Sequence, residues 1–89
     1  MIVKIDKSFQ KDVRKLNHST LNQKIAIIIQ EIKTASTISE IKNLKKLSTS
    51  QNAFRIRIGH YRLGLIIVDA EVTFIRCLHR KEIYKFFPK

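Results

Sequence analysis

Three arginines stand on either side of a candidate turn and could bind an anion together. Arg55 and Arg57 precede Gly59-His60, and Arg62 follows it. If Gly59-His60 is a two-residue hairpin turn, Arg57 lies directly opposite Arg62, and Arg55 lies opposite Gly64. Two cationic side chains facing each other across an antiparallel pair repel, so an anion between them is favoured. Guanidinium groups suit phosphate because each offers a planar fork of donors.

The same arginines also have a simpler interpretation as part of a solvated outer face. Long charged side chains on such a face splay apart into water, and a lone arginine on a strand is usually explained in this way. Here Arg55, Arg57 and Arg62 cluster on one predicted face. The clustering favours the anion site over the solvated face.

A second hairpin is expected to bring a histidine to these arginines. Residues 69–71 are a candidate turn between strands at 61–68 and 72–78. With an even number of turn residues near Ala70, His79 shares the face of Arg62, and Gly64 leaves an open floor between them. A three-residue turn with a bulge would swap the faces. On the even-turn register the remaining residues of the Arg62 face are Thr73, Ile75 and Cys77.

The opposite face of these strands is apolar and is expected to cover the helices. Arg76 falls on that face, and only an edge position accounts for it there. The apolar residues of this face are Phe54, Ile56, Ile58, Leu63, Leu65, Ile67, Phe74 and Leu78.

The N-terminal part of the sequence indicates one more strand and two helices that pack against the sheet. Residues 1–5 read as a short strand, Ser8 is a candidate cap for a helix, and Thr20 with Gln23 predicts the start of a longer one. Their apolar stripes predict a helical hairpin with one apolar side. The stripes consist of Phe9, Val13 and Leu16, and of Leu21, Ile25, Ile28, Ile29 and Ile32.

Residues 34–51 are expected to form one or two short helical turns. Thr37 and Glu40 repeat the capping-box spacing, and Ile38, Ile41, Leu44 and Leu47 recur at intervals of three. The complete pattern is β-α-α-β-β-β, which predicts an α+β fold with a helical hairpin on one face of an antiparallel sheet. At 89 residues the chain, 1–89, is expected to be a single domain.

The charge balance predicts an anionic partner. Eighteen Lys and Arg against seven Asp and Glu give a net charge of +11, which indicates nucleic acid, an anionic membrane or an acidic protein. The one cysteine, Cys77, excludes an internal disulfide, and no apolar run approaches the roughly 20 residues of a membrane span. We expect a cytoplasmic protein without a membrane partner. No residue spacing indicates a metal site or a cofactor.

Three segments together resemble the RelE/ParE toxin superfamily of bacterial toxin–antitoxin systems. They are Lys45-Lys46-Leu47, FRIRIGHYRLGL at 54–65 and LHRKEIYKFF at 78–87, and the helical hairpin and strand order fit as well. The resemblance implies an acidic antitoxin as partner. It also implies one of two activities, since RelE-like members cleave messenger RNA, typically on the ribosome, whereas ParE-like members inhibit DNA gyrase.

The resemblance also implies roles for individual residues. In RelE-like enzymes two basic residues precede the strand turn, an Arg follows it, and a basic residue and a Tyr lie near the C-terminus. The first three positions match Arg55, Arg57 and Arg62, and the last two match Arg80 (or His79) and Tyr84. Lys45, Lys46 and Lys81 are expected to add to phosphate binding.

One departure from the family pattern moves the acid–base chemistry elsewhere. The two basic residues before the turn are often Lys in RelE itself, where one has been proposed as a base. Arg55 and Arg57 stay protonated, so they can hold phosphate but cannot take a proton. His79 becomes the acid–base candidate because histidine exchanges protons near neutral pH, and Tyr84 could supply its phenol or stack on a base. His18 and His60 are expected to be solvated turn residues.

We therefore predict a metal-independent endoribonuclease that cleaves messenger RNA on the ribosome by attack of a 2′-hydroxyl on the adjacent phosphate. Two alternatives stay open. One is a ParE-like gyrase inhibitor without nuclease activity. The other is a basic RNA-binding domain that does not cleave, which the missing Lys base keeps open.

Overall fold

The computed structural model describes residues 1–48 and 50–88, which form one mixed sheet with helices on both faces. The elements are β1 (Ile2–Ile5), α1 (Lys7–Leu16), α2 (Ser19–Thr34), the 3-10 turn η1 (Ile38–Glu40), β2 (Leu44–Lys46), β3 (Ala53–Ile58), β4 (Tyr61–Val68), β5 (Glu71–His79) and α3 (Ile83–Phe86).

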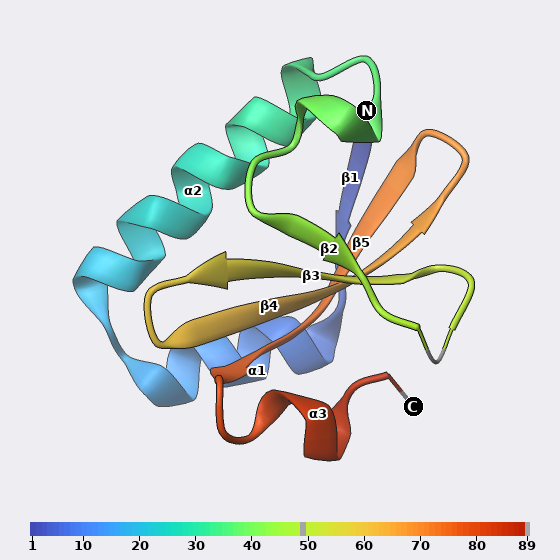
Figure 1. Ribbon diagram of the computed structural model, residues 1–89. Helices are drawn as coiled ribbons and strands as arrows, with labels where there is room; N and C mark the ends of the chain where they lie inside the picture. Colours follow the sequence, from blue (N-terminus) through green and yellow to red (C-terminus); the bar gives the residue numbers. More distant parts are fainter. Residues whose placement is uncertain (49, 89) are drawn as a thin grey trace.

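The five strands lie in the order β1-β5-β4-β3-β2 (Figure 1). β1 runs parallel to β5, and the other neighbours are antiparallel. The α+β class and the helical hairpin on one face are confirmed. The prediction of a wholly antiparallel sheet is wrong, because the chain enters the sheet beside its last strand and in the same direction.

The two helices of the hairpin begin at residues other than those predicted. Asp6, not Ser8, is the N-cap of α1, and its carboxylate accepts the backbone N–H of Ser8 at 3.1 Å. His18 caps α2 in place of Thr20, since its Nδ1 accepts the N–H of Leu21 at 3.1 Å. His18 is therefore exposed between the two helices, as predicted, and is also the N-cap of α2. None of the described helices has the length and apolar character to cross a membrane.

The segment before β3 contains one helical turn and an unpredicted strand. The capping pair is confirmed at η1, where the N–H of Thr37 donates to the Glu40 carboxylate at 2.8 Å. Leu44 was expected to continue the helical turns, but it begins β2. β2 pairs with the free edge of β3, with Lys45 opposite Arg55. Pairing with the next strand, and not the spacing of its own apolar residues, decides the conformation of such a short segment.

The first hairpin has the predicted register. Arg57 lies opposite Arg62 and Arg55 opposite Gly64, around a turn in which Gly59 has a φ of 56°. Gly59 is suited to that position because a positive φ costs it nothing.

The second hairpin has an even-residue turn, one of the two cases considered from the sequence, but the faces expected for that case are wrong beyond Phe74. Val68 lies opposite Glu71 across Asp69 and Ala70, and the simple register continues to Leu65 opposite Phe74. A bulge at Ile75 then shifts the pairing by one residue, so that Arg62 faces Leu78. A one-residue shift turns every later side chain over. The four residues whose predicted face is wrong are Arg76, Cys77, Leu78 and His79.

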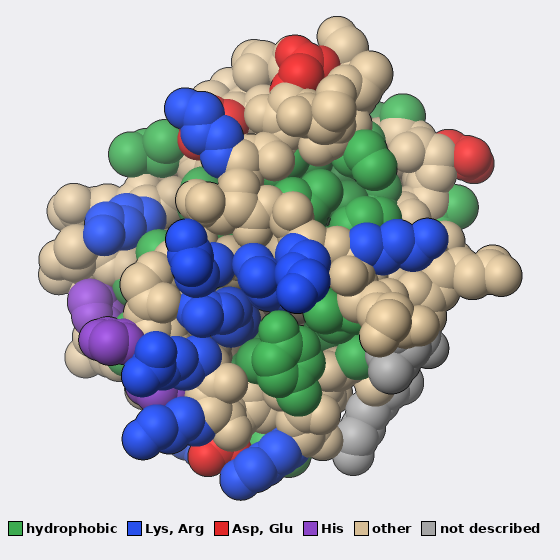
Figure 2. All heavy atoms as spheres, viewed as in Figure 1, with side chains coloured by type: hydrophobic (Ala, Val, Ile, Leu, Met, Phe, Trp, Pro, Cys, Tyr) green, Lys and Arg blue, Asp and Glu red, His purple; other side chains and the backbone are tan. Residues whose placement is uncertain are grey.

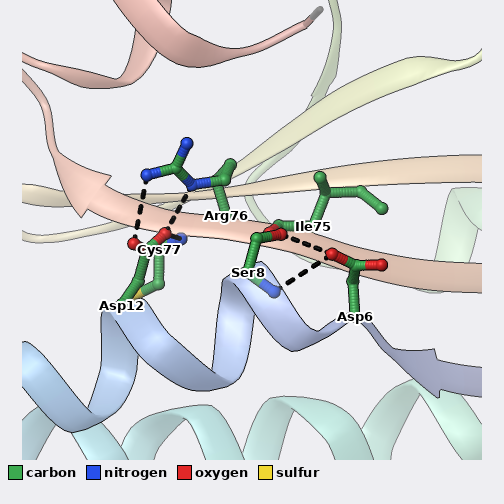
Figure 3. A network of polar contacts seen from close by, with 6 residues as sticks. All are labelled: Asp6, Ser8, Asp12, Ile75, Arg76 and Cys77. Atoms are coloured by element: carbon green, nitrogen blue, oxygen red, sulfur yellow. Dashed lines mark hydrogen bonds and ion pairs between the residues drawn. The ribbon is translucent and has the colours of Figure 1, made fainter.

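Side chains of α1 hold the bulged edge of β5 (Figure 3). β1 ends at Ile5, so beyond that point β5 has no partner strand on this side. The Ser8 hydroxyl donates to the carbonyl of Ile75, and the Asp12 carboxylate accepts the N–H of Cys77 at 2.9 Å. These bonds satisfy backbone groups that would otherwise be left unpaired by the bulge.

Two apolar cores lie on the two faces of the sheet. The larger core, between the sheet and the α1–α2 hairpin, includes Phe9, Leu21, Ile25, Ile56, Leu63 and Phe74. A smaller core on the other face, which we call the outer face, is built under α3 from Leu47, Ala53, Ile83 and Phe87. The predicted open floor at Gly64 is wrong, because the ring of Phe87 lies on this glycine.

Candidate phosphate-binding site

The outer face of the sheet carries a group of basic side chains over β3 and β4. Arg57 and Arg62 form one cross-strand pair, and Lys45 and Arg55 form the next. Figure 2 shows the Lys and Arg side chains gathered in the middle of this face, with histidines at its border. The side chains predicted from the first hairpin are therefore brought together.

A hollow of about 670 Å³ opens at the turn end of this basic group. Three of its lining residues are arginines, namely Arg57, Arg62 and Arg80. His60 and Gly59 contribute the β3–β4 turn, and the other side is formed by Lys24, Ile27, Ile28, Asn43 and Ile58. The hollow has room for a phosphodiester and offers mainly cationic donors, so it suits an anionic ligand.

Arg62 is the most constrained of these arginines. Its Nη1 donates to the carbonyls of Gly59 at 2.8 Å and of Tyr61 at 2.9 Å, which orients the guanidinium along the turn. Burial, followed by the charge of Arg55, lowers the pKa of Arg62, and the charges of Arg57 and Arg80 act in the same direction. A cation surrounded by other cations gains more from a bound phosphate than an isolated one.

Arg55 is half-buried and ties β3 to the segment before β2. Its Nη1 donates to the carbonyl of Asn43 at 3.2 Å. Its Nε is buried, and no partner for it exists among residues 1–48 and 50–88. Such a buried donor is costly to leave unpaired.

The C-terminal segment brings Arg80 and Tyr84 to the same group. The backbone N–H of Arg80 donates to the carbonyl of His60 at 2.7 Å, which fixes Arg80 beside the turn. Tyr84 is 59% exposed, and its electrostatic interaction with Arg62 acts to raise the pKa of Arg62. The aromatic core residue of this segment is Phe87 and not Tyr84.

The lysines predicted to bind phosphate are divided between the faces. Lys45 shares the outer face with Arg55. Lys46 lies opposite Phe54, whose side chain belongs to the helix-side core, so Lys46 points away from the basic group. Lys81 is exposed after β5 and does not line the hollow.

His79 does not share the face of Arg62 as predicted, but it lies against a histidine that lines the hollow. The bulge pairs His79 with Tyr61, whose ring it meets edge-on at 5.7 Å. The His60 and His79 rings stack with centroids 6.0 Å apart, and His18 meets Tyr61 at 5.6 Å. No spacing in the sequence indicates this cluster of three histidines, because it joins a helix cap, a turn and a strand end.

Arg76 belongs to the fold and not to the basic group. Its Nε donates to the Asp12 carboxylate at 2.7 Å and its Nη2 at 3.1 Å (Figure 3), and this bond raises the pKa of Arg76. Its guanidinium also lies 5.3 Å from the centre of the Phe86 ring. Among the residues that the structure describes, no three Cys, His, Asp or Glu side chains gather as metal ligands.

Comparison with known proteins gives consistent matches along the chain. A family model described as "ParE toxin of type II toxin-antitoxin system, parDE" matches residues 3–84. The chain is 35% identical over 89 residues to Toxin RelE3 of Methanocaldococcus jannaschii, covering 99% of this chain and 100% of that protein.

Two solved structures show the same fold. A chain in the crystal structure of the RelB–RelE antitoxin–toxin complex from Methanococcus jannaschii has a TM-score of 0.81 at 32% identity, with 96% of this chain and 99% of that chain covered. A chain of the toxin–antitoxin complex RelBE2 from Mycobacterium tuberculosis has a TM-score of 0.57 at 25% identity, with 89% and 96% covered.

Proposed function

Since this chain belongs to the RelE/ParE superfamily of toxins of type II toxin–antitoxin systems, we propose that it cleaves messenger RNA on the ribosome. The observation that carries the proposal is the hollow in which Arg57, Arg62 and Arg80 converge beside His60. A site that only covered a protein surface would not need three guanidinium groups and a proton-exchanging side chain around one small space.

The proposed reaction is attack of a 2′-hydroxyl on the adjacent phosphorus. A bond forms between the 2′-oxygen and phosphorus, and the bond from phosphorus to the 5′-oxygen of the next nucleotide breaks. A base takes the 2′-hydroxyl proton, and an acid gives a proton to the departing 5′-oxygen. The products are a 2′,3′-cyclic phosphate and a 5′-hydroxyl.

The roles of the cationic side chains follow from their donors and their permanent charge. Arg57, Arg62 and Arg80 hold the scissile phosphate and stabilise the negative charge that develops on its oxygens. Arg55 and Lys45 extend the cationic surface along the RNA backbone.

Proton transfer falls to histidine and tyrosine, since the arginines stay charged. Tyr84, exposed beside Arg62, is the acid for the 5′-oxygen. The base is drawn from the stacked pair of His60 and His79.

An acidic antitoxin is the proposed partner that neutralises the toxin. Both neighbouring structures described above are toxin–antitoxin complexes, and the net charge of +11 suits an acidic chain lying over the outer face. Arg57→Glu should therefore weaken binding of the antitoxin and lower the salt sensitivity of the binding that remains, because one attractive charge contact is lost. Titration of the purified proteins by calorimetry at two salt concentrations measures both effects.

Purified toxin added to ribosomes translating a defined messenger RNA tests the proposal, with the cut mapped by primer extension. Arg62→Ala should lower the cleavage rate about 10²–10³-fold, whereas Lys46→Ala, on the other side of β2, should leave it unchanged. Intact RNA together with inhibited DNA supercoiling would show the ParE-like activity for which the matching family model is named. RNA binding without cleavage on any ribosome would show a binding module.

A further inference from the structure

We propose that His60 is the residue that takes the 2′-hydroxyl proton, and that His79 is a positioning residue that holds the His60 ring in place. The inference rests on the proposed RNA cleavage and assigns its base. It moves the acid–base role from the strand-end histidine to a turn residue that the sequence indicates only as solvated.

The β3–β4 turn presents His60 directly to the hollow. His60 is exposed at the second position of the turn and lines the hollow together with Arg57, Arg62 and Arg80. Two bonds fix the turn itself. The N–H of Arg80 donates to the carbonyl of His60 at 2.7 Å, and Nη1 of Arg62 donates to the carbonyl of Gly59 at 2.8 Å. The residues that would hold the phosphate thus also hold the backbone that carries the imidazole.

The surroundings of His60 suit a base that accepts a proton from a bound nucleotide. The charged groups that share the hollow are cations from three strands or loops and from α2. They are Lys24, Arg57, Arg62 and Arg80. No carboxylate is among the described residues that line the hollow. A phosphate bound among these cations supplies the negative charge that stabilises the imidazolium after proton transfer.

The His79 ring packs against the side of the His60 ring that faces away from the hollow. It is half-buried, does not line the hollow, and stacks on His60 with 15° between the ring planes. Its Nδ1 accepts the N–H of Lys81 at 3.2 Å, and the Tyr61 ring contacts it edge-on. These contacts hold the His79 ring from two sides, so its flat face limits the orientations open to His60. His79 therefore contributes to the reaction only by orienting the His60 ring.

Every proton that moves in this step is taken or given by His60, Tyr84 or solvent. An imidazole nitrogen of His60 takes the 2′-hydroxyl proton as the 2′-oxygen bonds to phosphorus, and the bond to the 5′-oxygen breaks. Tyr84 gives its phenolic proton to the 5′-oxygen, and solvent then carries the proton of the imidazolium back to the phenolate. No metal, oxidant or cofactor takes part in the step.

Single-turnover cleavage on programmed ribosomes, measured from pH 5 to pH 9, tests the two roles separately. His60→Ala should lower the rate about 10²–10⁴-fold, leave ribosome binding within about twofold, and remove the rise of rate with pH that a general base produces. His79→Phe keeps a flat ring against His60 and should retain most of the rate and the same pH profile. His79→Ala removes the ring that stacks on His60 and should lower the cleavage rate about 10-fold or more without changing its dependence on pH.

His18→Asn is the matched control. It removes the third histidine of the cluster, and asparagine is among the best N-cap residues for α2, so its rate should equal that of the wild type. Full cleavage by His60→Ala would overturn the inference while leaving the proposed function intact. His79→Phe as inactive as His79→Ala would show that His79 itself exchanges the proton. A wild-type protein that leaves messenger RNA intact would overturn both proposals.

Discussion

The ring of Phe87 occupies the space that a side chain on Gly64 would need. A β-carbon built on Gly64 would stand 2.7 Å from Cδ2 and 2.8 Å from Cγ of Phe87. Phe87 and Ile83 are almost fully buried in the small core on the outer face, so this contact seats α3 on the sheet. Tyr84 lies between these two anchors, which makes its place beside Arg62 dependent on a glycine in β4.

Gly64→Ala should therefore destabilise the protein by about 1–3 kcal/mol, the usual cost of overpacking a filled core. Urea denaturation measures the change in the free energy of unfolding. Gly59→Asn is the control, since Gly59 has open space around it, and asparagine tolerates its φ of 56°. Adding Phe87→Ala should make the Gly64→Ala substitution nearly neutral. An equal cost in both backgrounds would contradict the contact.

Asp12→Ala should destabilise the protein far more than the loss of a surface ion pair. It leaves Arg76 without its carboxylate and the N–H of Cys77 without its acceptor, and breaking such a partly buried pair costs about 3 kcal/mol. Glu71→Ala is the control because the 2.8 Å pair of Lys4 and Glu71 is exposed, and its loss should cost below about 1 kcal/mol. Similar midpoints in urea for both variants would contradict the role of Asp12.

The thiol of Cys77 should be inert in the folded protein. Burial raises the pKa of Cys77 from 9.0 to about 12, and only the thiolate reacts with disulfide reagents. Labelling at pH 8 should therefore wait for unfolding and speed up with added urea. Rapid labelling of the native protein would show that β5 opens near the bulge at Ile75 and exposes Cys77 without unfolding of the whole protein.

The same shift in the pKa of Cys77 predicts the sign of an alkaline effect on stability. The folded state binds the thiol proton more tightly than the unfolded state, so the contribution is complete below about pH 9 and is lost as the pH rises toward 12. The loss should be smaller in Cys77→Ala, which lacks the group. Equal slopes of unfolding free energy against pH in both proteins would contradict this prediction.

Two adjacent lysines in β2 should differ in their effect on RNA binding. Lys45 shares the outer face with Arg55, whereas Lys46 points to the other side of the strand. Lys45→Ala should weaken binding of a short single-stranded RNA and lower the slope of log K against log salt by about 0.7. Lys46→Ala should change neither quantity. Fluorescence anisotropy over a series of salt concentrations measures both, and equal effects would place the RNA at the strand edge.

Much of the fold was accessible from local patterns in the sequence. The helical stripes, the two-residue turn at Gly59-His60 and the alternation around it predicted the helical hairpin and the facing of Arg57 and Arg62, because helix period and hairpin register depend on residues close together in the chain. The permanent charge of the arginines likewise followed from residue type alone.

Tertiary contacts decided the remainder of the site. β2 forms only because the edge of β3 is free to pair with it. The bulge at Ile75 persists because Ser8 and Asp12 of α1 satisfy its backbone, and it moves His79 from the face of Arg62 to the ring of His60. The bulge depends on groups far apart in sequence, and β2 depends on pairing with the next strand. The spacing of the apolar residues encodes neither. The sequence therefore determined that Arg57 and Arg62 face each other, and the tertiary structure decided which histidine lines the hollow beside them.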